Sequence, residues 1–292
     1  MLQVDAFVAN AIFQLPQASV YPFPSGYPRE GEVFAPVWQG SGRTIPCVVI
    51  SPPDKATGPV IPTRRVLLFH GNSETLEGAR PLAARLAAEC EANVYIVEYP
   101  GYWKPDTPDG EPSPRTAAGT YANAAFASRV LAMQKDAGPL HIVGYSLGTA
   151  LAVRVAKELG PQSVQSLSLI APICSVIGVA ATSPDDTVPM GFRPLLSLIK
   201  PLLSSMDVFC ADRDAPFVRV RSAVVYGDSD EVVNNSQGER MAALLRTEPL
   251  VVEGETHATV VGSRQTMKFI QENIVQGSEE EAPFQRVDLH RL

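Results

Sequence analysis

Cysteine is scarce in this sequence, and its spacing excludes whole classes of site. The four cysteines, Cys47, Cys90, Cys174 and Cys210, are widely separated among 292 residues, and none belongs to a C-x-x-C pair. Zinc sites and the disulfide frameworks of small secreted proteins both need cysteines at close, paired spacings. We therefore expect a reduced, cytoplasmic protein without a bound metal.

Positive charge is also in short supply. The chain has 24 lysines and arginines against 31 aspartates and glutamates, which gives a net charge of −7, and its basic residues form no cluster. A surface that binds nucleic acid needs a concentrated basic field, so the composition excludes nucleic acid as a partner.

Long hydrophobic runs are missing as well, although 45% of the residues are hydrophobic. No run reaches the length of about 20 residues that a membrane-spanning helix needs. The first 15 residues lack a basic start and contain Asp5, which argues against a cleaved signal peptide. We expect residues 1–30, in which Pro22, Pro24 and Pro28 cluster, to form an arm packed on the next domain. Peripheral attachment to a membrane is the alternative.

From residue 31 onward, short apolar strands alternate with helical patterns. A hairpin is expected over Glu32–Trp38 and Thr44–Ile50. Further strands are expected at Val66–Phe69, Asn93–Val97, Leu140–Tyr145, Val164–Ile170, Ser222–Tyr226 and Pro249–Val252. Helices are expected at Glu77–Cys90, Thr116–Ala137, Gly148–Leu159, Gln237–Arg246 and Val260–Val275. This alternation predicts an α/β domain over residues 31–276, with a mostly parallel central sheet and helices on both faces.

Two segments depart from this alternation. Residues 172–221 read as an insertion, in which apolar residues from Phe192 to Leu203 form a helical stripe around Pro201. We expect either a small helical cap over the ligand site or a helix packed on the sheet. Residues 277–292 are polar and are expected to form a disordered tail.

Gly144-Tyr145-Ser146-Leu147-Gly148 follows an apolar strand and precedes a helix. This is the setting of a G-x-S-x-G nucleophile elbow, which presents a serine hydroxyl on a tight turn at the end of the sheet. Glycine is expected at both ends because strand and helix backbones approach closely there. Ser146 is therefore the candidate nucleophile.

A serine nucleophile needs a base, and the chain has only four histidines. His290 lies in the tail, His141 precedes Ser146 in the same strand, and His70 ends a strand where its backbone is expected to matter more than its ring. His257 remains, on the loop after the last strand, and is the candidate base.

The base in turn needs a carboxylate, which is expected after the penultimate strand. Asp228, Asp230 and Glu231 compete for this role. We favour Asp230, because Asp228 abuts the strand and suits a turn, whereas Glu231 is expected to be solvated. The resulting order is nucleophile, acid, base.

A substrate oxyanion needs two backbone N–H donors. We expect one from Leu147, which directly follows the nucleophile. The other is expected from the loop after Val66–Phe69, where Asn72 is favoured over Ser73.

Five stretches of the chain match a known family: Leu68–Asn72, Glu98–Tyr102, Gly144–Thr149, Asp207–Cys210 and Gly227–Val232. Through them the chain resembles α/β-hydrolases over residues 30–276, and it is most similar to the eukaryotic abhydrolase-domain group that includes protein depalmitoylases. The chain departs from this group in lacking an N-terminal cysteine cluster, in Trp103 after Pro-Gly-Tyr and in Ala258 after the histidine. The resemblance implies an α/β-hydrolase fold, the triad Ser146, Asp230 and His257, and hydrolysis of an ester or thioester.

The sequence thus predicts a serine hydrolase that works without a cofactor. Its expected partner is a small-molecule or lipid-like acyl ester or thioester, with an acylated protein as a further candidate. The alternative is a catalytically silent hydrolase fold that serves as a binding or scaffold protein.

Overall fold

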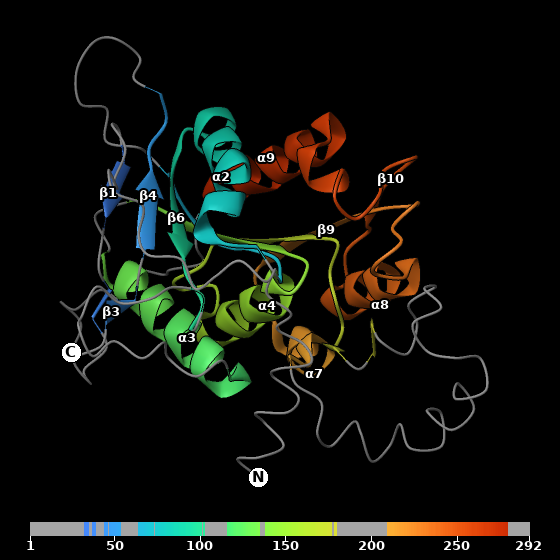
Figure 1. Ribbon diagram of the computed structural model, residues 1–292, viewed down its shortest axis with the longest axis horizontal. Coiled ribbons are helices and arrows are strands. Elements are labelled where there is room, and N and C mark those ends of the chain that lie inside the picture. Colours follow the sequence, from blue (N-terminus) through green and yellow to red (C-terminus); the bar gives the residue numbers. More distant parts are fainter. Residues whose placement is uncertain are drawn as a thin grey trace, which may run out of the picture.

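Strands and helices alternate along the chain, and the computed structural model in Figure 1 arranges them as a sheet between two helical layers. It describes residues 32–34, 37–38, 44–45, 47–53, 64–72, 74–100, 102, 116–134, 138–176, 178–179 and 209–279. Within these residues, eight strands form the main sheet and two short strands pair separately.

The main sheet has the strand order β1-β4-β6-β5-β7-β8-β9-β10. Its strands are β1 (Glu32–Phe34), β4 (Cys47–Ile50), β5 (Arg64–Phe69), β6 (Ala92–Val97), β7 (Leu140–Tyr145), β8 (Ser166–Ile170), β9 (Arg221–Gly227) and β10 (Leu250–Val252). From β6 to β10 all neighbouring strands are parallel, whereas β1 and β4 are antiparallel at one edge. The carboxyl ends of β5, β7, β9 and β10 therefore lie along one edge of the sheet, where ligands bind in folds of this kind.

Helices cover both faces of the sheet. They are α2 (Leu76–Cys90), α3 (Ala117–Met133), α4 (Gly148–Leu159), α7 (Ala211–Asp214), α8 (Asn235–Leu245) and α9 (Arg264–Glu279), with the 3₁₀ turns η3 (Ala215–Phe217) and η4 (Val260–Gly262). In Figure 1, α2 and α9 lie on one face, and α3, α4 and α8 on the other, which matches the two apolar clusters of the core. None of the helices in the described part of the chain is long and apolar enough to span a membrane.

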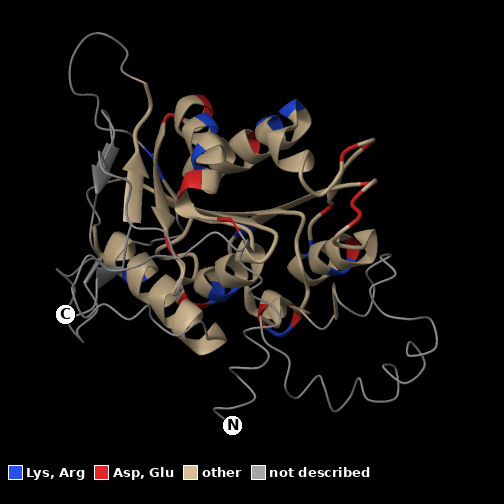
Figure 2. Cartoon of the chain, in the orientation of Figure 1, with Lys and Arg blue, Asp and Glu red and all other residues tan. Residues whose placement is uncertain are grey.

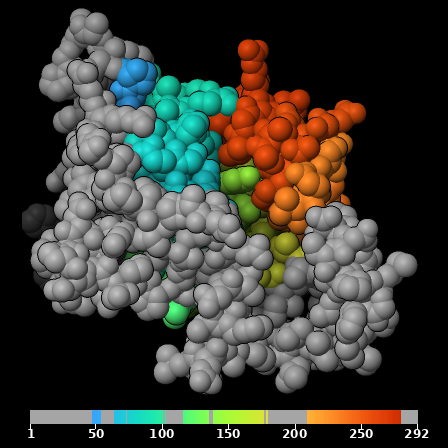
Figure 3. Space-filling view, viewed as in Figure 1, coloured from blue at the N-terminus to red at the C-terminus, as the bar shows by residue number. Residues whose placement is uncertain are grey.

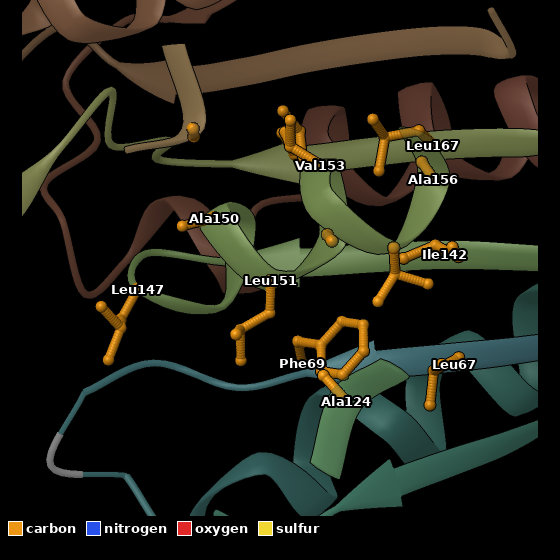
Figure 4. Close-up of a cluster of buried hydrophobic side chains, with 14 of the residues drawn as sticks. Leu67, Phe69, Ala124, Ile142, Leu147, Ala150, Leu151, Val153, Ala156 and Leu167 are labelled. Atoms are coloured by element: carbon orange, nitrogen blue, oxygen red, sulfur yellow. The ribbon is translucent and has the colours of Figure 1, made fainter. Parts of the chain in front are cut away.

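The packing of α4 on the sheet shows why this helix is held firmly. Figure 4 shows Leu151 of α4 lying near Phe69 of β5, with Ala124 of α3 beside them, and Leu151 and Phe69 are fully buried. Ala152 of α4 faces β7, since a Cβ at Gly144 would lie 2.8 Å from the Ala152 Cβ. Burying a leucine or phenylalanine side chain contributes about 1.5–3 kcal/mol to stability, so this contact fixes the position of the α4 N-terminus.

Local capping explains where two of these helices begin. The Thr75 hydroxyl accepts a hydrogen bond from Gly78 N (3.3 Å), and the Thr116 hydroxyl accepts one from Gly119 N (3.0 Å). Each threonine thereby satisfies one backbone N–H that the first helical turn leaves unpaired. The N-cap of α4, in contrast, is Leu147, and no side chain caps this helix.

The predicted α/β-hydrolase fold and the predicted order of strands and helices are confirmed, with shifts at the boundaries. The expected hairpin is present as β1 paired with β4, and β2 (Val37–Trp38) paired with β3 (Thr44–Ile45). The expected closing helix begins later, at Arg264, because residues 260–262 form the separate turn η4.

The C-terminal boundary is a second difference. α9 continues to Glu279, three residues into the expected polar tail, and Gly277 in its last turn is buried against β8. A Cβ at Gly277 would lie 3.0 Å from that of Ser166, so the glycine permits this approach. Residues 280–292 and the N-terminal arm lie outside the described residues.

Most of the expected insertion, including the Phe192–Leu203 stripe, also lies outside the described residues. Its last described part includes α7, which packs against α4. Asp214 of α7 forms ion pairs with Arg154 (3.3 Å) and Lys157 (2.5 Å) of α4.

Candidate active site

Ser146 occupies the sharp turn between β7 and α4. Its φ of +51° lies in the left-handed region, which a residue with a side chain rarely adopts. The turn is held by hydrogen bonds from Ser146 N to Ile170 O (2.9 Å) and from the Thr149 hydroxyl to Ser146 O (2.6 Å). Strained backbone that its surroundings hold in place is concentrated at functional sites, and it is the geometry that the elbow pattern predicts.

The two glycines of the elbow stand where neighbouring backbone leaves no room for a side chain. A Cβ at Gly144 would lie 2.7 Å from Gly148 O and from the Cα of Thr149. A Cβ at Gly148 would lie 2.1 Å from Phe69 O. The close approach of strand and helix therefore requires glycine at both positions, as the sequence pattern suggested.

Three polar side chains from three different strand ends form a continuous hydrogen-bonded chain. His257 Nε2 lies 3.0 Å from Ser146 Oγ, and His257 Nδ1 lies 2.8 Å from Asp230 Oδ2. Ser146 and His257 are partly buried, whereas the Asp230 side chain is 1% exposed. The three residues selected from the sequence are thus brought together within hydrogen-bonding distance, although 111 positions separate the serine from the histidine.

The carboxylate of Asp230 is held on its other side by backbone. Its Oδ1 accepts hydrogen bonds from Val232 N (2.9 Å) and Val233 N (2.7 Å), which leaves Oδ2 for the histidine. The competing acids do not contact the imidazole through their carboxylates. Asp228 Oδ1 accepts from Gly254 N (2.7 Å), which fits the turn role expected for it, and the exposed Glu231 accepts from His257 N (3.3 Å).

The two expected oxyanion donors come from different elements, the start of α4 and the loop after β5. Leu147 is the N-cap of α4, where backbone N–H groups have no partners within the helix. Asn72 lies in the loop after β5, and its side-chain Oδ1 accepts a hydrogen bond from the hydroxyl of Tyr102 (3.0 Å). Ser73, the alternative donor, lies outside the described residues.

The ring of His70 was expected to matter less than the backbone of this residue. In the structure the ring is buried, and both of its nitrogens have polar partners. His70 Nε2 lies 3.1 Å from Glu98 Oε1, Nδ1 lies 3.0 Å from Gly71 O, and the ring stacks on Tyr99 with centroids 4.0 Å apart. His141, in contrast, lies at the other end of β7 and contacts Ser166 and Ser278, away from Ser146.

Sequence reasoning assigned no role to several residues that border the site. Tyr145 donates its hydroxyl to His257 O (3.1 Å), and burial raises its pKa above the ordinary value. Glu98, Tyr99 and Tyr102 contact the loop that contains Asn72. One signal in the sequence could have indicated these contacts: Glu98 is a charged residue directly after an apolar strand. A carboxylate buried at such a position needs a partner.

The rim beside the histidine is acidic. Figure 2 shows acidic residues along the loops after β9 and β10, which contain no lysine or arginine; besides the buried Asp230, these are Asp228, Glu231, Glu253 and Glu255. In Figure 3, the green surface of the segment around β7 and α4 lies between the teal surface of residues 64–90 and the orange to red C-terminal elements.

Among the described residues, no group of His, Cys, Asp and Glu side chains is arranged to hold a metal ion.

Comparisons with known proteins agree with this architecture. A thermophilic and thermostable carboxylesterase cloned from a metagenomic library has a similar structure, with a TM-score of 0.58 and 18% identity, over 95% of this chain and 96% of that chain. An esterase of Pyrococcus furiosus has a TM-score of 0.62 and 12% identity, over 90% of this chain and 98% of that chain. A hyperthermophilic esterase from the archaeon Pyrobaculum calidifontis has a TM-score of 0.59 and 16% identity, over 94% and 89%.

Identities this low establish a shared fold rather than a shared substrate. The sequence itself matches a model of the alpha/beta hydrolase family over residues 66–252, which is well over half of the chain. This chain therefore belongs to the alpha/beta hydrolase family.

Proposed function

We propose that this protein is a serine hydrolase that cleaves carboxylic esters or acyl thioesters through an acyl-enzyme on Ser146. The observation that carries the proposal is the unbroken line of contacts from Ser146 Oγ through both nitrogens of His257 to Asp230 Oδ2, at 3.0 and 2.8 Å. A nucleophile within reach of a base that a third group orients is the arrangement that makes a serine hydroxyl reactive.

The first half of the reaction forms the acyl-enzyme. His257 Nε2 takes the proton of Ser146 Oγ as this oxygen attacks the carbonyl carbon of the substrate, and Asp230 stabilises the imidazolium that results. Negative charge that develops on the carbonyl oxygen is stabilised by the backbone N–H groups of Leu147 and Asn72. When the tetrahedral intermediate collapses, His257 returns the proton to the alcohol or thiol that leaves.

The second half uses water. His257 removes a proton from a water molecule that attacks the acyl carbon, the same two backbone donors stabilise the oxyanion, and the carboxylic acid leaves as Ser146 Oγ recovers its proton. The cycle is balanced by water alone and uses no organic cofactor or metal ion.

Two observations support the proposed substrate class. The three similar structures reported above are of proteins described as esterases or a carboxylesterase. The acidic rim beside His257 disfavours substrates that carry negative charge near the scissile bond, so we propose neutral acyl groups. The resemblance of five sequence stretches to the depalmitoylase-containing group adds acyl thioesters, acylated proteins among them, as a branch of the same proposal.

A series of p-nitrophenyl esters and acyl thioesters of increasing chain length tests the proposal, with wild type measured beside Ser146→Ala. The matched control is Ser229→Ala, which removes a nearby exposed hydroxyl that contacts Asp228 rather than the histidine. We expect Ser146→Ala to lower kcat by about 10⁴-fold or more and Ser229→Ala to leave it within about twofold.

A fluorophosphonate probe supplies an independent readout, because it labels a reactive serine without needing the right substrate. We expect labelling of Ser146 in wild type and in Ser229→Ala, and none in Ser146→Ala. Absence of both turnover and labelling in the wild type would overturn the proposed function and favour a binding protein built on a hydrolase fold.

A further inference from the structure

Three residues at the end of β6 surround the loop that follows β5. Glu98, Tyr99 and Tyr102, here called the β6 clamp, are each at most 2% exposed. Tyr102 N donates to Tyr99 O (3.1 Å), which closes a four-residue turn with Pro100 at its second position, where proline is favoured. Tyr102 then lies beside the loop after β5, because its hydroxyl donates to Asn72 Oδ1.

The first member of the clamp fixes both ends of the loop. Glu98 Oε1 contacts His70 Nε2 (3.1 Å) and accepts from Tyr99 N (3.0 Å). Glu98 Oε2 accepts from Leu76 N (3.0 Å), the first residue of α2. A single buried carboxylate thus joins the end of β5, through His70, to the start of α2.

The two tyrosines hold the loop between these ends. The hydroxyl of Tyr99 donates to His70 O (2.7 Å), and the hydroxyl of Tyr102 donates to Asn72 Oδ1 (3.0 Å). Both rings contact the His70 ring, one stacked with centroids 4.0 Å apart and the other edge-on at 6.0 Å. The loop therefore has hydrogen-bonded attachments at both His70 and Asn72.

Charge strengthens this arrangement. His70 Nδ1 faces the carbonyl oxygen of Gly71 and Nε2 faces the carboxylate of Glu98, and a ring that carries a proton on each nitrogen donates to both. Burial lowers the pKa of His70, but its hydrogen bond to Glu98 and the charges of Glu98 and Glu74 outweigh this and raise the pKa overall. For Glu98, burial raises the pKa, whereas the contacts with His70 and the backbone N–H groups of Leu76 and Tyr99 lower it overall.

We propose that Glu98, Tyr99 and Tyr102 are positioning residues that hold the loop 70–72 so that its backbone N–H at Asn72 meets the oxyanion of a substrate bound at Ser146. This inference rests on the proposed function and assigns the β6 clamp a part in it. A donor in an oxyanion hole lowers the barrier only when it is already placed where the negative charge develops. The other donor, Leu147, is fixed by α4, whereas Asn72 lies on a loop and depends on residues outside that loop for its position.

The variants Tyr102→Phe and Tyr99→Phe test this inference, because each removes one hydroxyl and keeps the ring packing. The matched control is Tyr95→Phe, on the same strand β6 and three residues before the clamp. Loss of one oxyanion-hole donor costs about 10²–10³-fold in kcat, so a displaced donor should cost about tenfold, with KM within about twofold. Glu98→Gln, if natively folded by circular dichroism, should reduce kcat at least as much.

A second readout separates positioning from a merely structural role. Trifluoromethyl ketone inhibitors add to the serine and place an oxyanion in the hole, so their affinity should fall by the same factor as kcat/KM in both clamp variants. If both variants keep kcat and inhibitor affinity within twofold of Tyr95→Phe, or lose activity through KM alone, the proposal is wrong.

Amide hydrogen exchange keeps the test independent of the proposed function. We expect the amides of residues 70–72 to exchange about tenfold faster in Tyr102→Phe than in Tyr95→Phe, because an attachment of the loop is lost. Equal exchange in the two variants overturns the clamp. A wild type that hydrolyses nothing and takes no fluorophosphonate overturns the proposed function instead, and the exchange result still decides whether the clamp holds the loop.

Discussion

Gly148 lies against the end of β5 so closely that a Cβ there would stand 2.1 Å from the carbonyl oxygen of Phe69. The same Cβ would lie 2.6 Å from His70 O. The first residue of α4 thus touches the backbone at the end of β5, where the loop 70–72 begins. The two halves of the candidate site, the elbow and the loop after β5, are in direct backbone contact at this glycine.

This contact predicts that Gly148→Ala is severely destabilising. The atoms that the methyl group meets belong to backbone within the sheet, so relief requires moving β5, α4 or both. We expect a loss of about 3 kcal/mol or more in the free energy of unfolding, measured by urea denaturation, or failure to fold. Gly262→Ala is the matched control, because its Cβ would meet nothing within 4 Å. Equal stability of the two variants would contradict the prediction.

A second prediction concerns Asp230→Asn. The Val232 and Val233 amides need an acceptor, so the asparagine oxygen would remain with them and its NH₂ group would face His257 Nδ1. The imidazole would then have to accept at Nδ1 and carry its proton on Nε2, where it can no longer take the proton of Ser146. We expect kcat for the best ester substrate to fall by about 10³–10⁴-fold with little change in KM.

The matched control for this variant is Asp228→Asn, which keeps the oxygen that accepts from Gly254 N. We expect kcat within about threefold of wild type, because this side chain supports a turn and does not contact the imidazole. The reverse result, with Asp228→Asn inactive and Asp230→Asn active, would transfer the acid role to Asp228.

The third prediction concerns stability and pH. Burial, with the charges of Arg64 and Arg65, lowers the pKa of His141 from 6.5 to about 3. Below pH 6.5 the unfolded chain binds a proton at His141 that the folded protein does not, so acidification favours unfolding. The contribution of His141 to stability is complete above pH 6.5 and declines as the pH falls toward 3, by up to about 1.4 kcal/mol for each pH unit.

Urea denaturation of wild type and His141→Gln between pH 7.5 and 5.0 measures this contribution. It is the difference between the two proteins in how steeply the free energy of unfolding changes with pH. Both proteins contain His70, so any slope that comes from its raised pKa cancels in the difference between them. Identical slopes in the two proteins, or an NMR titration in which His141 protonates near pH 6.5, would refute the prediction.

The cysteines give a fourth prediction. Burial raises the pKa of Cys47, Cys90 and Cys174 to about 12, so almost none of these thiols is ionised at pH 8. Cys210 is partly exposed. We expect iodoacetamide at pH 8 to modify Cys210 first in the folded protein and all four cysteines in urea, as read by mass spectrometry. Early modification of any of the three buried cysteines in the Cys210→Ser variant would contradict this account.

The sequence was sufficient for the architecture because the signals that specify it are local. Apolar strands alternating with helices predict a parallel sheet. Two glycines around a serine predict the tight turn at Gly144–Gly148. The choice of His257 needed only the order of elements, since few histidines were available. These residues meet because the carboxyl ends of parallel strands share one edge of the sheet, a consequence of topology that the pattern already contains.

The contacts of the His70 ring and of the β6 clamp, in contrast, depend on the tertiary structure. Glu98 and His70 are 28 positions apart and lie at the ends of adjacent parallel strands, where burial removes water as an alternative partner. Nothing in the spacing of the two residues specifies that contact. It arises because the pairing of β5 with β6 places both side chains in the same dry space, where a charge is stable only beside its opposite.

The choice among Asp228, Asp230 and Glu231 likewise depended partly on the sequence and partly on the tertiary structure. The sequence by itself determined that an acid follows β9, because three stand there within four residues. The sequence favoured Asp230 among them, but the contact with the imidazole is made by the folded loop, since the amides of Val232 and Val233 bind one oxygen of Asp230 while Gly254 N binds Asp228. Composition and periodicity determine which elements form and in what order, whereas the partner of each polar side chain is set by the three-dimensional packing that removes water from it.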